Sequence, residues 1–174
     1  RIHYKMESGY KERLMAAIIL TGKKTPHHWS EKTSLVNFYD LKGMVENLLH
    51  SLLIKGPLFS PSKLSSFHPS AQATVNNNGV QIGVLGQVHP VILKQLGIEK
   101  PLFFAQLDLL DLLEAKKTHA TFAPLPIYPG SVRDWTVSVK KSLSYAKLLD
   151  MIKEAPSKLL KEVSIVDLYT DPKI

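Results

Sequence analysis

The clearest periodic pattern in the chain is helical and lies between residues 41 and 53. Apolar residues recur there at intervals of three and four, so they line one continuous face of an α-helix. Asp40 stands where the N-cap of that helix is expected. The stripe predicts core packing within its own domain, with a contact to a partner subunit as the alternative. Its members are Leu41, Met44, Val45, Leu48, Leu49 and Leu52.

Apolar runs and alternating patterns predict strands on both sides of this helix. Residues 14–20 read as a short buried strand, followed by a polar loop at 22–32. Residues 56–79 are rich in Pro, Ser and Asn and predict loops around a short strand near 73–75. Asn78-Gly79 is a hairpin-turn signal ahead of a strand at 80–89. A further strand is predicted at 102–107.

Two glycines interrupt these patterns. Gly43 lies in the first turns of the predicted helix and lowers its stability by about 1 kcal/mol relative to Ala. It either permits close approach of another backbone or is neutral. Gly86 disturbs the alternation of the strand at 80–89 and marks a bulge or a close backbone approach.

Two shorter helices are predicted in the same region. Pro90 suits the first position of a helix that Gly97 ends, with His89 at the corner between strand and helix. Residues 107–117 read as a helix that has acidic residues early and lysines late, which suits the helix dipole.

Three prolines at 124, 126 and 129 mark a stiff linker, which predicts a domain of residues 1–121 and a second of residues 122–174. In the second, alternation at 135–139 predicts a strand. Ser144 then caps a helix that ends at Pro156, and 163–169 predicts another strand. The apolar face of that helix consists of Tyr145, Leu148, Leu149 and Ile152. The fold class is therefore α+β, ending in a β-α-β unit.

The composition limits the class of protein. The chain has 174 residues, 44% of them hydrophobic, which suits one or two globular domains. The longest apolar run, at 14–20, is too short to span a membrane. The absence of cysteine excludes disulfides and thiolate catalysis, and it predicts a cytoplasmic location. No cleavable signal peptide is visible. Because the first residue is Arg1 and not Met, we expect a piece of a longer protein.

The net charge of +7 favours binding to polyanions. The numbers of Arg and Lys that supply this charge indicate which kind of phosphate site the chain can form. Only three residues are Arg, namely Arg1, Arg13 and Arg133, whereas 19 are Lys. Arg supplies the planar fork that grips phosphate with two hydrogen bonds, so the chain is poorly equipped to hold ATP. The lysines equip the chain well for diffuse contact with a phosphate backbone. Lysines gather near the end of the chain, either as a solvated face or as a surface for a polyanion; they are Lys140, Lys141, Lys147, Lys153, Lys158 and Lys161.

Three other motifs do not predict chemistry. His27-His28 has no acidic or histidine cluster at metal-ligand spacing, which indicates a solvated loop. Gly83-x-x-Gly86 lacks the lysine and helix start of a phosphate loop, which indicates close packing inside a strand. His89, Ser131 and Asp134 lack the nucleophile elbow of a hydrolase triad.

Four ordered motifs carry a resemblance to a known family. They are ILTG with Trp29 downstream, FYDLKG (38–43), GVLGQVHP (83–90) and YPGSVRDW (128–135). Together they resemble the C-terminal part of the β subunit of bacterial-type phenylalanyl-tRNA synthetase. Two positions depart from the family pattern: Ser70-Ala71 follow His68-Pro69 where Gly-Arg is frequent, and Ser131 stands where an apolar residue is usual.

The resemblance implies a fold and a function for each domain. Residues 1–121 would form a class II synthetase-like antiparallel sheet with helices. This domain would be non-catalytic and would serve as a scaffold for the catalytic α subunit in a heterotetramer of two α and two β subunits. Residues from 122 would begin a ferredoxin-like anticodon-binding domain. ATP and magnesium would belong to the whole enzyme, and no cofactor is expected in this part of it.

Candidate tRNA-binding residues follow from this interpretation: Arg133, Lys140, Lys141, Lys147, Lys158 and Lys161. For Arg133 we expect a structural ion pair at the entry of the first strand, with a phosphate contact as the second choice. Two other functions stay open. One is a stand-alone basic RNA-binding or protein-interaction module, and the other is a catalytically active class II enzyme.

A ferredoxin-like sheet also requires a third strand to complete its backbone hydrogen bonds. Its first and second strands are parallel, with the third between them. Without the third strand, both predicted strands of residues 122–174 would lack ladder partners, and each buried unpaired group costs about 1–3 kcal/mol.

Overall fold

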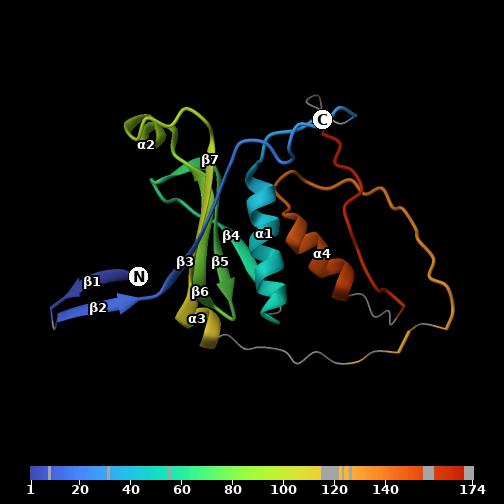
Figure 1. Ribbon diagram of the computed structural model, residues 1–174. Helices are drawn as coiled ribbons and strands as arrows, with labels where there is room; N and C mark the ends of the chain where they lie inside the picture. The colour runs from blue at the N-terminus through green and yellow to red at the C-terminus, as the bar shows by residue number, and fades with distance from the viewer. Residues whose placement is uncertain are drawn as a thin grey trace. The chain divides into compact units, whose positions relative to one another are not determined.

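The computed structural model describes residues 1–7, 9–30, 32–54, 56–114, 122, 124–125, 127–154 and 159–170. The chain divides into two compact units, unit 1 (Arg1–Ala123) and unit 2 (Pro124–Ile174). Unit 1 is α+β with antiparallel sheets (Figure 1). Its elements are β1 (Ile2–Met6), β2 (Gly9–Arg13), β3 (Met15–Thr21), α1 (Phe38–Ser51), β4 (Leu58–Pro61), β5 (Phe67–Asn77), β6 (Val80–Val88), α2 (Pro90–Gln95), β7 (Leu102–Asp108) and α3 (Leu109–Glu114).

The body of unit 1 is a five-stranded antiparallel sheet in the order β3-β7-β6-β5-β4. Helix α1 packs on one face of this sheet, against β3, β6 and β7 (Figure 1). The fully buried side chains Leu41, Val45 and Leu49 of α1 meet Leu85 and Leu107 of the sheet in one core cluster. The predicted helix stripe is therefore core except at Met44, which is exposed. The strands expected at 14–20, 80–89 and 102–107 are confirmed.

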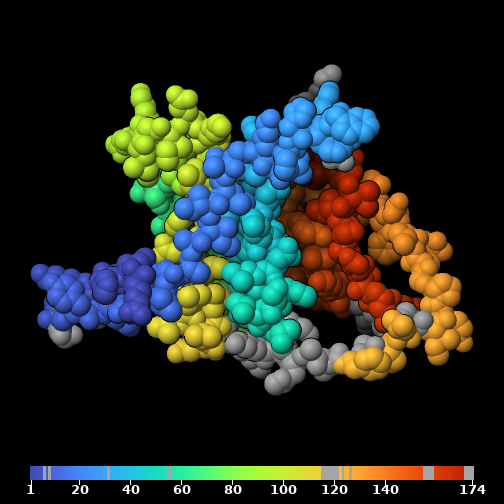
Figure 2. Space-filling model, viewed as in Figure 1, coloured from blue at the N-terminus to red at the C-terminus, as the bar shows by residue number. Residues whose placement is uncertain are grey.

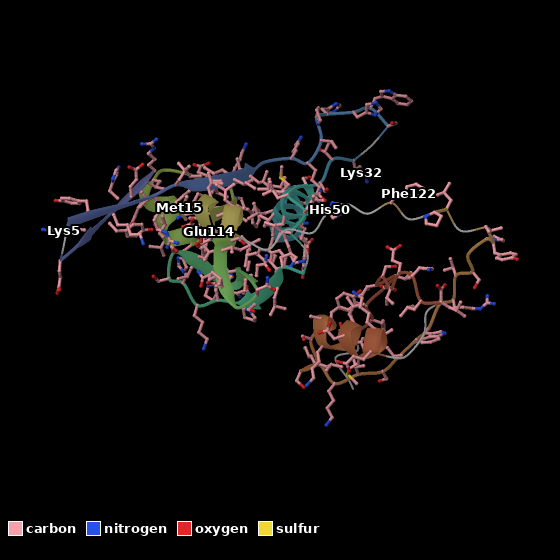
Figure 3. All side chains as sticks on the ribbon, turned by 90° about the horizontal axis from the view of Figure 1, so that it is seen from below. Lys5, Met15, Lys32, His50, Glu114 and Phe122 are labelled. Carbon is pink, nitrogen blue, oxygen red and sulfur yellow. The ribbon has the colours of Figure 1, made fainter. Side chains whose placement is uncertain are left out.

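Strands β1 and β2 form a separate two-stranded hairpin. Figure 2 shows it as a projection from the body of unit 1. In Figure 3, Lys5 lies towards the far end of the hairpin, and Met15 lies where the chain enters the larger sheet. Only Leu14 separates β2 from β3, so the chain passes directly from the hairpin into the larger sheet.

Helix α1 begins earlier than the apolar pattern indicates. The N-cap is Asn37, whose side chain accepts hydrogen bonds from the backbone N–H groups of Tyr39 (2.8 Å) and Asp40 (3.2 Å). The side chain of Asp40 in turn accepts a hydrogen bond from the backbone N–H of Asn37 at 2.7 Å. The expected N-cap Asp40 is thus wrong, because it is the third residue of a capping box in which both side chains satisfy otherwise unpaired donors.

Strand β5 is the largest error in the prediction for unit 1. Residues 56–79 contain β4 and the eleven-residue β5, not loops around a short strand. Ala73 and Val75 are buried on the α1 side, whereas Gln72, Thr74 and Asn76 alternate with them on the other face. The pairing of β5 with β6 shifts register between Phe67 and Gln72 and again between Val75 and Asn76, so the polar residues obscure a real strand.

The turn and the glycines behave largely as the patterns indicate. Asn78 and Gly79 both have positive φ (50° and 81°), as a tight hairpin turn between β5 and β6 requires. A Cβ on Gly83 would lie 2.6 Å from the Gln106 carbonyl oxygen, and one on Gly86 would lie 2.9 Å from that of Ala71. Both glycines therefore permit close strand packing. Gly43 faces open space, so the close approach considered there is absent.

The two short helices are confirmed. The His89 side chain accepts from the N–H of Val91 and caps α2, and Pro90 is the first residue of that helix. Gly97, with φ of +69°, ends it, and the N–H of Ile98 donates to the carbonyl of Leu93 at 2.9 Å. The predicted helix at 107–117 corresponds to α3, and its residues from 115 lie outside the described part.

Unit 2 contains the predicted helix, α4 (Tyr145–Glu154). The Oγ atom of Ser144 accepts from the N–H of Lys147 at 3.4 Å, as expected of a cap. The strands expected at 135–139 and 163–169 are wrong, because neither segment has a ladder partner among the described residues. A strand needs a second strand to satisfy its backbone groups, and the described residues of unit 2 supply none.

Candidate nucleic-acid interface

The predicted RNA-facing cations in unit 2 belong to two described segments. Lys140 and Lys141 precede α4, where the N–H of Leu143 donates to the carbonyl of Lys140 at 2.9 Å and closes a turn. Lys147 lies in the first turns of α4, and Lys161 lies in the segment 159–170. All four side chains are exposed. Lys158 lies outside the described residues, so its position is not part of this arrangement.

Helix α4 has one apolar and one polar side. Leu148, Leu149 and Ile152 are half-buried, whereas Lys147 and Asp150 are exposed. The turn at Lys140 and Lys141 thus continues into a helix whose polar side also carries lysine. The described segment 127–154 records no ion pair for these lysines, which leaves their ammonium groups accessible to an anion.

Arg133 does not form the ion pair expected from its neighbour Asp134. Its one recorded hydrogen bond goes to the carbonyl of Val132, at 3.4 Å, and the side chain is exposed. Without a strand at 135–139, there is no strand entry for an ion pair to order. Within the described residues the guanidinium therefore has no carboxylate partner.

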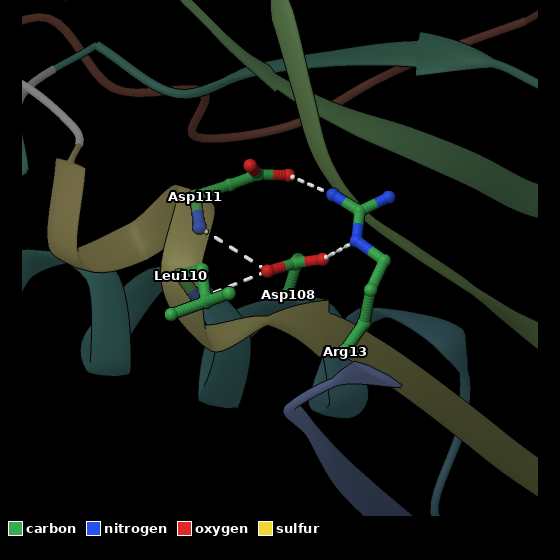
Figure 4. Close-up of polar contacts among 4 residues, drawn as sticks. All are labelled: Arg13, Asp108, Leu110 and Asp111. Carbon is green, nitrogen blue, oxygen red and sulfur yellow. Dashed lines mark hydrogen bonds and ion pairs between the residues drawn. The ribbon is translucent and has the colours of Figure 1, made fainter. Parts of the chain in front are cut away.

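Both arginines of unit 1 are bound to carboxylates. The Nε atom of Arg1 lies 3.0 Å from Glu12 across the hairpin. Arg13 holds two aspartates: its Nε lies 2.6 Å from Asp108 Oδ2, and its Nη2 lies 3.0 Å from Asp111 Oδ2 (Figure 4). No guanidinium of unit 1 is left to grip a phosphate.

The Arg13 cluster is built from three elements. Asp108, at the end of β7, is 3% exposed, and its Oδ1 accepts from the N–H groups of Leu110 (2.9 Å) and Asp111 (3.2 Å) at the start of α3 (Figure 4). It caps α3 while its other oxygen faces Arg13 at the end of β2. Sequence reasoning missed this cluster, although an Asp just before a helical pattern is a capping signal.

The sheet face away from α1 offers little for nucleotide chemistry. Opposed pairs on that face include Val84 with Gln106 and Gly86 with Phe104. Phe67 covers Gly86 and stacks on Phe104 with ring centroids 6.4 Å apart. The described residues also contain no cluster of three or more His, Asp or Glu side chains able to hold a metal ion.

The loop between β3 and α1, predicted as a polar loop at 22–32, holds an aromatic and basic tip. Lys32, labelled in Figure 3, lies in this loop. Trp29 is 90% exposed, and its ring stacks on His28 with centroids 5.8 Å apart. Around them is an open hollow of about 610 Å³. The base of the loop is closed by hydrogen bonds from Lys24 N to Ser34 O (2.9 Å) and from Val36 N to Gly22 O (3.0 Å).

An ion pair also ties this loop to α1. The Nζ atom of Lys24 lies 2.7 Å from Asp40 Oδ1. The hydrogen bond from Lys24 has the largest effect on the Asp40 carboxyl. Together with the hydrogen bond from the backbone N–H of Asn37 and the charge of Lys24, it holds the pKa of Asp40 below its ordinary value of 3.8, against the opposing effect of desolvation.

A second open hollow, of about 460 Å³, lies beside α2 and is lined by Leu93, Lys94, Gly97, Ile98 and Glu99 among others. It combines one cation and one anion with apolar side chains. No arrangement of donors there favours a particular ligand.

Comparisons with known proteins place these features in a family. Residues 1–109 match the family model described as the phenylalanyl tRNA synthetase beta chain CLM domain. Residues 126–174 match the ferredoxin-fold anticodon binding domain. No helix among the described residues is long and apolar enough to cross a membrane.

Individual relatives agree with these matches. The phenylalanine–tRNA ligase beta subunit of Protochlamydia amoebophila is 38% identical over 174 residues, which is 100% of this chain and 22% of that protein. Those of Chlamydia abortus and Bacillus subtilis are 35% and 36% identical over 97% and 91% of the chain, and 22% and 19% of their own lengths. The chain therefore spans about a fifth of the length of these relatives.

Proposed function

Because the chain belongs to the family of phenylalanine–tRNA ligase β subunits, we propose that it is a non-catalytic part of such a subunit, which holds a catalytic α subunit and contributes to tRNA binding. The observation that carries this proposal is the order of the two family matches: the first lies within unit 1 and the second within unit 2. Unit 1 then acts as the scaffold, and unit 2 provides the tRNA contact.

The engaged arginines support the non-catalytic role of unit 1. A site that activates an amino acid with ATP must stabilise the phosphates, and Arg is the side chain best suited to this. Arg1 and Arg13 both form ion pairs with carboxylates, and the partner of Arg13, Asp108, is buried. Releasing Arg13 to a nucleotide would leave a buried charge unpaired, which is strongly unfavourable.

The architecture of unit 1 supports its place in a larger assembly. The five-stranded antiparallel sheet of unit 1, with helix α1 on one face, is compatible with the class II synthetase architecture. In this proposal two α and two β subunits form a heterotetramer in the cytoplasm. The α subunit binds ATP and magnesium and joins phenylalanine to tRNA, and the present chain holds neither cofactor.

The exposed lysines of unit 2 support a backbone contact with tRNA. Lysine is a flexible point charge that neutralises phosphate without reading a base, and each neutralised phosphate releases counterions. In this proposal Lys140, Lys141, Lys147 and Lys161 supply such contacts, together with Lys158 and the unpaired Arg133. The match of residues 126–174 to the ferredoxin-fold anticodon binding domain points to the anticodon region of the tRNA.

The experiment that tests the proposal is the salt dependence of tRNA binding by the chain. Replacing Lys140 and Lys141 together by Ala should lower the steepness of the plot of log K against log salt concentration by about 1.4 to 1.8, since two phosphate contacts are lost. Fluorescence anisotropy with a labelled tRNA over a range of salt concentrations measures this slope.

The matched control replaces Lys5 and Lys11, which are exposed on the β1–β2 hairpin, by Ala. This variant loses the same charge, so its slope should remain that of the unchanged chain. Equal slopes for both double variants would contradict the assigned tRNA contacts. ATP–pyrophosphate exchange by the chain alone would contradict the non-catalytic role.

A further inference from the structure

The loop between β3 and α1 carries a tryptophan ring that the fold of unit 1 leaves in solvent. Trp29 is 90% exposed. Figure 3 shows the loop, with Lys32 on it, extending away from α1. A single exposed apolar residue is common on protein surfaces, so the role of Trp29 must be argued from the groups around it.

The ring next to Trp29 is held in one orientation. The His28 and Trp29 rings stack with centroids 5.8 Å apart and planes 30° apart. The Nδ1 atom of His28 accepts from the backbone N–H of Ser30 at 3.3 Å and lies 2.8 Å from the Ser30 Oγ atom. A ring nitrogen that accepts from an N–H carries no proton, so the neutral imidazole has its proton on Nε2. His28 therefore supports one side of the indole and offers a hydrogen-bond donor beside it.

The base of the loop is tied to the rest of unit 1. An antiparallel bridge joins Lys23 and Leu35, and backbone hydrogen bonds flank it. The ammonium group of Lys24 pairs with Asp40 of α1 at 2.7 Å. A ring on a loop closed in this way loses less conformational freedom on binding than a ring on an open loop.

The open hollow of about 610 Å³ around Trp29 is polar and basic. Trp29 is the one apolar side chain among the described residues that line it. Residues 22–37 contain three lysines and one acid, Glu31. Each of the other described lining residues has a side chain able to donate a hydrogen bond; they are His27, His28, Ser30, Lys32 and Thr33.

These surroundings favour a nucleotide over a protein side chain as the partner of Trp29. An anchor residue of a protein interface typically lies in a well-packed pocket from which its neighbours exclude water. Single-stranded nucleic acid instead stacks a base on an aromatic ring, next to cations that neutralise the phosphate backbone. Paired bases are already stacked within their helix, so the ring is available only to an unpaired base.

We infer that Trp29 is a stacking platform for an unpaired nucleotide of tRNA, and that Lys32 contacts the phosphate of that nucleotide. This inference rests on the proposed function, because tRNA is the RNA that supplies the nucleotide. It adds an RNA contact in unit 1 that differs in kind from the lysines of unit 2. Stacking releases no counterions, so the contribution of Trp29 does not change with salt as theirs does.

Binding of labelled tRNA to variants of the 174-residue chain, measured by fluorescence anisotropy, tests the inference. Trp29→Ala should raise the Kd at least about fivefold, as expected for the loss of one stacked base. It should leave the slope of log K against log salt concentration unchanged, because no charge is lost. Trp29→Phe keeps an aromatic ring and should keep most of the affinity. The matched control is Tyr10→Ala, which removes a 79% exposed ring from the hairpin and should leave the Kd unchanged.

The fluorescence of Trp29 reports on the stacked base directly. The chain has two tryptophans, so Trp135→Phe leaves Trp29 as the only one. A single-stranded oligoadenylate should quench the emission of this variant strongly. A blunt RNA duplex of the same length, at the same concentration of phosphate, should leave it nearly unchanged, because its bases are paired.

Three results would overturn the inference. The first is an unchanged Kd for tRNA in Trp29→Ala. The second is quenching by the duplex as strong as quenching by the single strand. The third is loss of the α subunit from the αβ enzyme on Trp29→Ala with tRNA binding by the chain unchanged, which would assign the ring to a protein partner.

Failure of the proposed function gives a different pattern. If Lys140 and Lys141 can be replaced without a change in salt slope while Trp29→Ala still weakens tRNA binding, the contacts assigned to unit 2 are wrong and the stacking site stands. If the slope changes as expected and Trp29→Ala has no effect, the stacking site alone is rejected.

Discussion

Asp40 illustrates how one residue joins local and distant structure. It accepts from the N–H of Asn37 in the capping box of α1, and it receives the ammonium group of Lys24 from the preceding loop. A helix N-terminus also favours a negative charge. The carboxylate therefore stabilises both the start of α1 and the base of the loop that carries Trp29.

The lowered pKa of Asp40 fixes the direction of its pH dependence. Since the folded pKa lies below the unfolded one, ionised Asp40 stabilises the fold above its ordinary pKa of 3.8, and this contribution is lost as the pH falls through the folded pKa. Lys24→Met should raise the pKa of Asp40 towards 3.8. Carboxyl NMR titration measures it, with Lys32→Met from the same loop as the control that leaves it unchanged.

At the scale of elements, unit 1 depends on close contact between β6 and its neighbours. Gly83 lies against β7, where a Cβ would meet a Leu107 methyl carbon at 2.4 Å and the Gln106 carbonyl at 2.6 Å. A backbone carbonyl in a paired strand cannot move aside as a flexible side chain can. The strand spacing therefore requires glycine at this position.

A pair of Gly→Ala substitutions separates packing from propensity. Gly83→Ala should lower the free energy of unfolding by about 1–3 kcal/mol through overpacking. Gly43→Ala in α1 should raise it by about 0.5–1 kcal/mol, because the site is open and Ala favours helix. Urea denaturation measures both changes. A Gly83→Ala variant as stable as the unchanged chain would refute the close strand contact.

At the scale of the whole molecule, the two units differ in the contacts that stabilise each of them internally. Unit 1 has a sheet covered by α1 and a continuous core. The described part of unit 2 has one helix with no buried residue, flanked by segments without ladder partners. Trp135 is 79% exposed, although the alternation at 135–139 predicted a strand.

This difference predicts an exchange pattern across unit 2. In the 174-residue chain, the amides of residues 135–139 and 163–169 should exchange at nearly unstructured rates, whereas those of β6 and β7 should be protected. Hydrogen exchange measured by NMR distinguishes these groups. Strong protection at 135–139 in the monomeric chain would show a strand pairing that the described residues do not contain.

The sequence by itself determined the elements whose signals are local. Helix α1 follows from apolar spacing of three and four, α2 from Pro90 and Gly97, and the β5–β6 turn from Asn78-Gly79, because each depends on neighbours within a few residues. The small number of Arg residues likewise argued against a nucleotide-binding site. The four ordered motifs pointed to the family.

Only the tertiary structure decided what depends on residues distant in the chain. The hydrogen bond from Arg13 to Asp111 joins residues 98 positions apart, and no local pattern predicts it. The strand order and the full length of β5 arise from ladders between segments. For the same reason the strand patterns of unit 2 misled: alternation describes a face that suits a sheet, but a strand exists only where another strand satisfies its backbone.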